Sequence, residues 1–594
     1  MTKKRYYTLV ILGILIISIV GTLAWLTWKS KETALVLTVG EIDGTRVTLK
    51  PYVIEDTLIP TLTYDNNEVI KVNIKNNGNE DSQVVLYYNI SKIDNELITD
   101  SFKYTILRST DNGNSYAEYK EGNFVNANIS SDFIILKEDI LKNTEYNYQI
   151  YTWLDGSNET SSSIQGKVFK AELNASIYNS QDIIVDLPDG MIPVTIADNG
   201  EVTTIAKDDA SWYDYNEKKW ANAVLVTESS RSTYSNTDGV TIPEDNILAY
   251  YVYIPRYKYK IWTVGTSVEG QEQEIDILFE DRNNKVNGTK VGEYLTHPAF
   301  TFGDTELNGI WVGKFETTGD GTTPTIKPNM ASLTNQNVST AFITSLKFAG
   351  GALDNGVTTF SGSDTYGLTT STNSHMMKNN EWGAVAYLSH SRYGINGEVR
   401  INNYWYNWIR NFKTLTGCGA SSANASQDVT CGITYGKSSL YPQSTTGNIS
   451  GIFDMSGGAG EKVMGVFANS DGILFSGNST SSNSGFNGLL GADGTAKTDG
   501  IAVPESKYYE VYKASSGTTI SPLTACSGEY CYGQSLSETS GWYGDYANFV
   551  SATNPWLGRG GNYANNVGAG VFESGNGTGA GFVHSSFRAV LTVQ

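Results

Sequence analysis

The chain is poor in the side chains that metal and thiol chemistry require. Its 594 residues include only 4 His and 4 Cys. The cysteines fall into two close pairs, Cys418 with Cys431 and Cys526 with Cys531, and no His or further Cys lies at zinc-ligand spacing beside either pair. We therefore expect two local disulfides, each stabilising the fold by roughly 2 to 3 kcal/mol. No metal and no cofactor is expected.

Charge is scarce and unbalanced. Only 18% of the residues are charged, and 62 Asp and Glu against 42 Lys and Arg give a formal net charge of -20. Nucleic-acid affinity depends on cations that neutralise phosphates, so a nucleic-acid partner is not expected. Glycine (60) and tyrosine (37) are abundant instead, which is typical of folded β-rich modules with many turns.

One long uncharged run stands at the N-terminus, from Tyr6 to Trp28, between Lys3, Lys4 and Arg5 and the later Lys29. At 1.5 Å per residue the run measures roughly 34 Å, enough to cross a hydrocarbon core of about 30 Å. We expect residues 1–31 to anchor the chain in the cell membrane through a single helix, with a cytoplasmic N-terminus and an extracellular bulk. A cleaved signal peptide is the alternative interpretation.

Residues 32–186 show the alternation of half-buried strands. Ile70, Val72 and Ile74 alternate with polar residues, and after a turn-forming stretch Val84 to Ile90 forms a second run, which predicts a hairpin. Several such strands favour an all-β immunoglobulin-like sandwich serving as a stalk. With Gly21 to Trp25 at the end of the apolar run, this layout resembles the camelysin and TasA-type surface proteins of Gram-positive bacteria.

The rest divides into a connector and a large domain. Residues 187–246 carry an aromatic island, Trp212 to Tyr215 with Trp220, which either docks the connector or offers a stacking platform to a carbohydrate. Residues 247–594 read as one α+β domain with strands near Tyr251 and Gly309. Helices are expected at 339–349, capped by Ser339 or Thr340, and at 380–392, stopped by Gly394.

Four pieces of this last region carry a family resemblance. They are 252–255, 310–317, 451–457 with Glu461, and 559–563 followed by Phe587 and Arg588. In this order they resemble the formylglycine-generating-enzyme-like (sulfatase-modifying factor) branch of the C-type lectin fold. The third piece departs from the family, which usually has Asn, Val and Trp where this chain has 458–460, with Lys462 after Glu461. That departure puts in doubt any calcium site that relatives build there.

The enzymes of that family use two cysteines shortly after the Arg-Gly-Gly motif, because a thiolate must exchange with substrate and hold copper. The matching positions here are Asn565 and Gly570, which can do neither. Cys526 and Cys531 have the right spacing but precede Arg559. The chain is therefore expected not to be an enzyme, with an oxidase as the less favoured alternative.

The terminal segment 556–588 resembles the variable region of proteins that diversity-generating retroelements diversify by error-prone copying at adenines. The resemblance implies fixed scaffold residues and exposed display residues. The scaffold would be Trp556, Arg559, Gly560, Gly561, Ala569, Gly570, Phe572, Phe587 and Arg588. The ligand-binding display would be Asn562, Tyr563, Asn565, Asn566, Glu573, Asn576, Thr578, Phe582, Val583 and His584.

The residues themselves also favour display. Glycine recurs every few positions between Gly558 and Gly581, which predicts loop held by its ends. Small amides and hydroxyls beside larger aromatic faces resemble the mixture in antibody paratopes. His375 and His390 have no partner in sequence and are expected to be solvated or satisfied. We expect an adhesion or recognition protein for an unknown surface ligand, protein or glycan; a structural fibre protein or a phage receptor-binding protein is the alternative.

Overall fold

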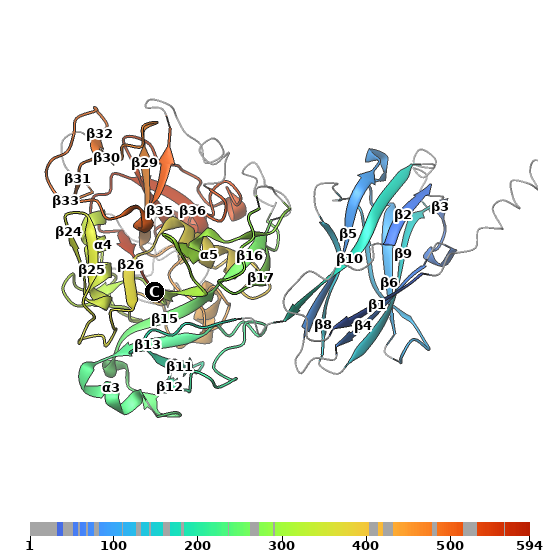
Figure 1. Cartoon of the computed structure of the whole chain (residues 1–594), viewed down its shortest axis with the longest axis horizontal. Coiled ribbons are helices and arrows are strands. Elements are labelled where there is room, and N and C mark those ends of the chain that lie inside the picture. Colours follow the sequence, from blue (N-terminus) through green and yellow to red (C-terminus); the bar gives the residue numbers. More distant parts are fainter. Residues whose placement is uncertain are drawn as a thin grey trace, which may run out of the picture. The chain divides into compact units, whose positions relative to one another are not determined.

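The computed structural model forms two compact units, Met1–Asn179 and Ser180–Gln594, shown in Figure 1. The structure describes residues 33–39, 52–57, 60–66, 69–76, 82–109, 111–125, 127, 132–141, 144–157, 167–179, 183–235, 237–261, 272–288, 292–402, 414–419, 432–477, 484–514, 531–563 and 565–593.

The N-terminal unit is a two-sheet β-sandwich. One sheet has the order β1-β4-β9-β6-β7, with β3 beside β9, and the other has the order β2-β10-β5-β8. The strands are β1 Thr33–Val39, β2 Tyr52–Thr57, β3 Pro60–Thr61, β4 Val69–Asn76, β5 Ser82–Ile93, β6 Phe102–Ser109, β7 Ala117–Asn123, β8 Asp132–Ile140, β9 Glu145–Asp155 and β10 Val168–Asn179, with short 3-10 turns η1 Tyr64–Asn66 and η2 Asn95–Leu97.

Alternating apolar residues of both sheets meet in the core of the sandwich. Ile70 and Val72 of β4 pack in one cluster with Leu86 and Tyr88 of β5 and with Phe169 of β10. The expected strands are therefore present, but the predicted hairpin is wrong. β4 pairs with β1 and β9, whereas β5 pairs with β8 and β10, so the two consecutive strands lie in different sheets. Each strand finds partners further along the chain.

An eight-stranded sheet forms the centre of the C-terminal unit, in the order β14-β12-β11-β13-β15-β21-β38-β26. Its strands are β11 Ile192–Ile196, β12 Val202–Thr204, β13 Asn222–Val226, β14 Thr241–Ile242, β15 Ile247–Pro255, β21 Gly309–Gly313, β26 Thr372–Met376 and β38 Ala589–Val593. The stretch 187–246, expected as a connector, thus supplies four of the eight strands. Its island is core: Trp212, Tyr215 and Trp220 are buried, which leaves no platform for a sugar.

This sheet is covered on both faces. Val252 and Ile254 of β15 pack into one core cluster, while the alternating Tyr251 and Tyr253 pack into a second. The first cluster also contains apolar side chains of helix α5 (Asn379–Ser389) and of a second sheet, which has the order β34-β29-β35-β36 with β37 beside β29. These strands are β29 Gly460–Ala468, β34 Glu510–Lys513, β35 Trp556–Gly560, β36 Gly570–Gly577 and β37 Ser585–Phe587. In Figure 1 they are orange to red, toward the top of the unit.

Helices are short. They are α3 Glu228–Tyr234, α4 Val338–Leu346 and α5 Asn379–Ser389, with 3-10 turns η4 Glu244–Asn246, η5 Pro298–Phe300, η6 Lys347–Ala349, η7 Ser438–Gln443, η8 Ser506–Tyr508, η9 Trp542–Gly544 and η10 Asn566–Gly568. Both expected helices form, but Asn337 caps α4, since its side chain accepts the N–H of Thr340. Ser339 and Thr340, the expected caps, lie inside the first turn.

Smaller strands complete the unit in two- and three-stranded pairings. They are β16 Tyr257–Lys260, β17 Asp276–Phe279, β18 Leu295–Thr296, β19 Thr301–Phe302, β20 Thr305–Glu306, β22 Thr318–Gly319, β23 Pro324–Thr325, β24 Gly351–Asp354, β25 Val357–Phe360, β27 Cys418–Gly419, β28 Ile433–Thr434, β30 Phe475–Gly477, β31 Phe486–Asn487, β32 Leu490–Gly491 and β33 Ile501–Ala502.

The predicted fold class is corrected in two respects. Strands make up 41% of the structure and helices 13%, so the C-terminal unit is mostly β and not α+β. The sequence signals for α4 and α5 were sound, but these helices span only 9 and 11 residues beside two sheets. Second, no described helix is long and apolar enough to cross a membrane. The single-pass localisation in the cell membrane is therefore corrected; residues 1–31, from which it came, lie outside the described residues.

Candidate functional site

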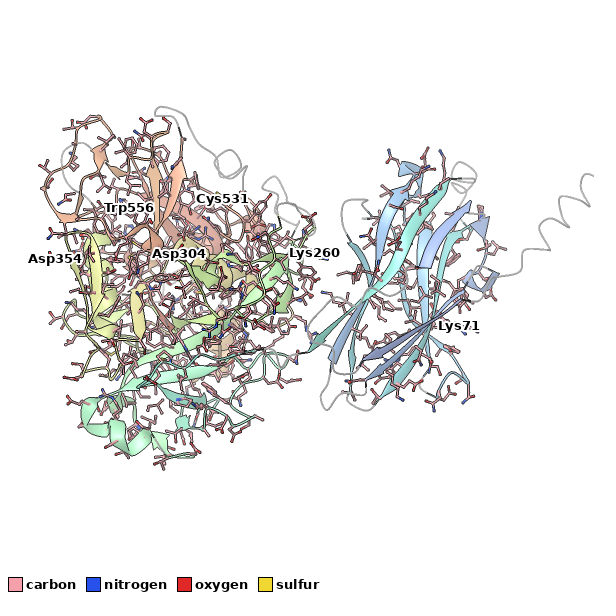
Figure 2. The ribbon with its side chains drawn as sticks, in the orientation of Figure 1. Lys71, Lys260, Asp304, Asp354, Cys531 and Trp556 are labelled. Atoms are coloured by element: carbon pink, nitrogen blue, oxygen red, sulfur yellow. The ribbon has the colours of Figure 1, made fainter. Side chains whose placement is uncertain are left out.

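The segment 556–588 is more regular than the expected loop. It contains β35, η10, β36 and β37, and β35 pairs antiparallel with β36 on one side and with β29 on the other. Its first residue, Trp556, is labelled in Figure 2. Glycines weaken strand propensity, yet here the backbone ladder to two neighbours holds them in extended conformation. The loop prediction was therefore wrong for the residues of β35, β36 and β37.

A hollow of about 340 Å³ lies over this sheet. It is lined by residues of β29, β35, β36 and β37 and of the segments next to them: Gly460, Glu461, Lys462, Asn554, Trp556, Leu557, Gly558, Arg559, Gly561, Asn562, Asn565, Glu573, Gly575, Asn576, Gly577, Thr578, Gly579, Phe582, His584 and Ser585. Ligand pockets commonly measure about 300 to 1,000 Å³, so a small ligand or one group of a larger ligand would fit.

Glycines form the floor of this hollow. Lys462 lies opposite Gly558, and Gly558 lies opposite Gly575, so all three share one face of the sheet. A Cβ atom at Gly558 would meet no atom nearer than 3.8 Å, and one at Gly577 none nearer than 4.0 Å. Crowding does not force glycine at these two positions, whereas a Cβ at Gly575 would lie 3.0 Å from Oε1 of Glu573. Their missing side chains leave the hollow empty; we call Gly558, Gly575 and Gly577 the glycine floor.

Two other glycines of the segment have a different role. Gly560 and Gly561 have φ values of 80° and 65°, in the left-handed region where L side chains are strained. A Cβ at Gly561 would also lie 2.7 Å from the Cα and Cβ of Ala569. The pair therefore ends β35 with a sharp change of direction, which fixes where the residues after it enter the rim.

Buried arginines hold the sheet beneath the hollow. Arg588 pairs with Glu461 through Nε to Oε2 at 3.1 Å and through a second, shorter contact, and it donates to the carbonyls of Gly313 (2.7 Å) and Phe453 (3.0 Å). These bonds join β29 to β21 of the large sheet. Arg559 donates to the Ser535 carbonyl at 2.9 Å, and burial lowers its pKa to about 10.

All of the predicted scaffold residues are buried: Trp556, Arg559, Gly560, Gly561, Ala569, Gly570, Phe572, Phe587 and Arg588. The predicted display residues are mostly accessible. Asn576, Phe582 and Val583 are exposed, and Asn562, Asn565, Thr578 and His584 are half-buried. The side chain of Asn566 lies outside the described residues. Seven display positions line the hollow, namely Asn562, Asn565, Glu573, Asn576, Thr578, Phe582 and His584.

Two predicted display residues differ from that expectation because they are buried. Tyr563 is only 6% exposed, and its backbone N–H donates to the Gly458 carbonyl at 2.9 Å. Glu573 is also 6% exposed and accepts the N–H of Gly561 at 2.9 Å. Burial raises the pKa of Glu573 to about 7, against the lowering effect of Arg559. Glu573 lines the hollow from within, whereas Tyr563 supports the turn and is not a contact residue.

The rim combines an aromatic plate with a buried amine. The rings of Phe582 and His584 stack, with centroids 5.6 Å apart and planes at 20°. Lys462, 7% exposed, donates from Nζ to the Ser585 hydroxyl at 2.7 Å. Burial lowers the pKa of Lys462 to about 7. The pKa of His584 is also lowered, mainly by burial and to a smaller extent by the charge of Lys462.

The remaining chemical candidates take part in packing. Among the described residues, no group of three or more His, Cys, Asp and Glu side chains could hold a metal ion. His375 is buried between Asn373 and Glu381, at 2.9 and 2.8 Å, and His390 packs edge-on against Trp542 and Phe572. Cys418 and Cys531 are disulfide-bonded. Their expected partners, Cys431 and Cys526, lie outside the described residues.

Sequence reasoning missed the floor and one wall of the hollow. Gly558, Gly575 and Gly577 were taken for loop, and Lys462 was noted only as a departure from a family motif. The strand 460–468 held a signal for Lys462, because all residues between it and Ala468 are apolar or glycine. A lone cation at the start of such a buried strand faces a low-dielectric environment and needs a compensating partner or an opening.

Comparisons with known proteins add little. No family model and no curated protein matches the chain. Similar solved structures include the pre-peptidase C-terminal domain of a collagenase from Bacillus anthracis (13% identity, TM-score 0.14) and CorA, a surface-associated copper-binding protein of Methylomicrobium album BG8 (6% identity, TM-score 0.14). Each likeness covers 25% of this chain and 99% of the other. At these scores neither carries an argument about fold or function.

Proposed function

We propose that this chain is a non-enzymatic recognition protein whose contact site is the hollow over the glycine floor. One observation carries the proposal. Seven of the ten display residues selected from the sequence line a single hollow of about 340 Å³, although they come from β36 and from separate turns. A set chosen for exposure and contact chemistry need not converge on one concavity, and convergence is what a binding site requires.

Rigid support makes the hollow suited to selective binding. Its floor is a three-stranded ladder of β29, β35 and β36, and Arg588 bonds that ladder to the large sheet. Sites built on strands hold contact groups more accurately than sites on free loops, so less ordering entropy is lost on binding. The rim then varies in chemistry, with amides, a hydroxyl and an aromatic plate.

The resemblance to the C-type lectin fold and to retroelement-diversified proteins belongs to the same proposal. Diversification needs positions that change without loss of the fold. Burial of the nine scaffold residues and accessibility of Asn576, Phe582 and Val583 support that division. Substitution at exposed rim positions typically changes stability by less than about 0.5 kcal/mol, whereas buried positions cost far more. Glu573 and Tyr563 would then belong to the fixed set.

The experiment fills the hollow without disturbing the fold. Gly558→Leu places a side chain on the floor, where the structure offers open space. A fragment and glycan library is screened by saturation-transfer NMR against the full chain and against this variant, with Lys71→Ala on β4 of the N-terminal unit as control. Ligands that bind the full chain and the control but not Gly558→Leu are expected. Hits that bind all three equally, or a complete absence of hits, would overturn the proposal.

A further inference from the structure

Lys462 is a buried amine for which the described residues provide no counter-charge. It is 7% exposed, and its Nζ makes one hydrogen bond, to the neutral hydroxyl of Ser585. Among the described residues no carboxylate lies within ion-pair distance of it. Long charged side chains are almost never fully buried unless they are paired. Acidic residues outnumber basic ones in this chain, which has a net charge of -20, so a buried lysine without an acidic partner is unusual.

The ionisable groups around Lys462 do not supply the missing charge. The side chain of the neighbouring Glu461 lies on the other face of β29, where its carboxylate pairs with Arg588. Arg559 of β35 lies opposite Glu461, on that same face. Glu573 of β36 lines the hollow, but it accepts the Gly561 N–H, and burial raises its pKa to about 7, so it carries little negative charge below that pH. His584, from the turn before β37, adds no negative charge.

We propose that Lys462 binds the carboxylate of an acidic sugar seated in the hollow. This inference rests on the proposed function, since it needs the hollow to be a binding site. The carboxylate would accept from the Lys462 ammonium, with the Ser585 hydroxyl beside it as a second donor. Charge-assisted hydrogen bonds of this kind are about twice as strong as neutral ones, and burial strengthens them further.

The remainder of the lining favours a sugar over a peptide terminus. Side chains of Asn554, Asn565 and Thr578 can both donate and accept, which matches hydroxyl groups that do both. Phe582 is 42% exposed and stacked on His584, so an apolar face is presented at the rim, where the C–H face of a pyranose packs well. The glycine floor leaves depth for one sugar ring.

Binding should depend on pH through Lys462 and through Glu573, which lines the same hollow and whose pKa burial raises to about 7. Burial lowers the pKa of the free lysine to about 7, so below this pH the ammonium is present before the ligand arrives. Above it, a proton must be taken up on binding, and the affinity for the carboxylate falls by about tenfold for each pH unit until the pKa of the bound form is reached.

The test compares acidic sugars with neutral counterparts on the full chain. Methyl glycosides of glucuronate, galacturonate and N-acetylneuraminate are titrated beside the methyl glycosides of glucose and galactose, at pH 6 and at pH 9. At least one acid is expected to bind at least about tenfold more tightly than the neutral sugars at pH 6. Lys462→Met, which keeps the length and apolar character of the side chain, should weaken the binding of that acid by about 10- to 100-fold and leave the affinity for the neutral sugars unchanged. Lys513→Met, an exposed position on β34, is the matched control.

A second measurement needs no variant. Trace acetylation of the wild-type chain, followed by peptide mass spectrometry, reports the reactivity of Lys462 against pH, and the bound acid should protect Lys462 but not Lys513. Three results overturn the inference: no acidic sugar binds, acids and neutral sugars bind alike, or Lys462→Met has no effect. If Gly558→Leu still removes fragment binding in those cases, the hollow remains the binding site, and only the claim that Lys462 binds a sugar carboxylate there is wrong. Binding of a peptide with a free C-terminus, in place of any sugar acid, would also overturn it.

Discussion

Substitution by alanine should have opposite effects on stability at two nearby glycines, Gly558 of the glycine floor and Gly561 after β35. At Gly558 an alanine Cβ meets no atom nearer than 3.8 Å, and the residue lies in β35 without a left-handed φ. Glycine in a strand costs about 0.5 to 1 kcal/mol relative to alanine, so Gly558→Ala should stabilise the C-terminal unit by up to that amount.

At Gly561 the outcome is reversed. An L residue at φ 65° costs about 1 to 2 kcal/mol, and the added Cβ would overlap Ala569 at 2.7 Å. The free energies of unfolding of the two variants should therefore differ by about 1.5 to 3 kcal/mol. Urea unfolding of the full chain measures this through tryptophan fluorescence, because 9 of the 12 Trp lie in the C-terminal unit. The reasoning is refuted if Gly558→Ala destabilises by more than about 1 kcal/mol, since the space above the floor would then be filled.

Three further predictions concern the support, the pH response and the gene. Arg588→Met leaves the Glu461 carboxylate buried without its partner and should lower the free energy of unfolding by about 3 to 5 kcal/mol in urea titrations; a loss below about 1 kcal/mol would contradict the anchoring role. Burial raises the pKa of Asp545 to about 9, so the folded state holds a proton that the unfolded state releases near pH 4. Stability should then fall as pH rises from about 4 to 9, and Asp545→Asn should flatten this fall in thermal unfolding; an unchanged slope would exclude Asp545 as its source. Finally, a near-identical repeat of the codons for 556–588 should lie near a reverse transcriptase gene and differ at template adenines; sequencing that finds neither would remove the diversification hypothesis.

Local alternation predicted strands well wherever one face of a strand is buried. Phe169, Ala171 and Leu173 alternate with polar residues, and these three are buried in the sandwich core. Pairing was not predictable in the same way. β4 and β5 follow one another like a hairpin, but their partners, β9 and β10, lie far along the chain, and no local pattern records such contacts.

Strands that are buried on both faces were missed more often than strands with one buried face. In the stretch 187–246 the apolar runs are short and separated by polar turns, so they looked like a linker. Asn222–Val226 is buried at every position, because β13 lies inside the eight-stranded sheet with cores on both faces. The burial of Trp212 and Trp220 follows from the same arrangement, and a carbohydrate platform there was ruled out only by tertiary structure.

The candidate site was predictable in composition but not in shape. Residue chemistry and the family resemblance selected Asn562, Phe582 and His584, which line the hollow. The floor was missed because glycine in sequence signals a turn, while Gly558 and Gly575 lie opposite one another in a ladder. Lys462 was missed as a contact residue because register, not spacing, brings β29 beside β35.

The most direct measurement is a crystal structure of the full chain with a ligand obtained from the NMR screen. We expect density for that ligand over Gly558 and Gly575, within hydrogen-bond reach of Lys462 or the rim amides, and contacting Phe582. Density for the ligand elsewhere on the chain, with this hollow holding only water, would contradict the claim that it is the binding site.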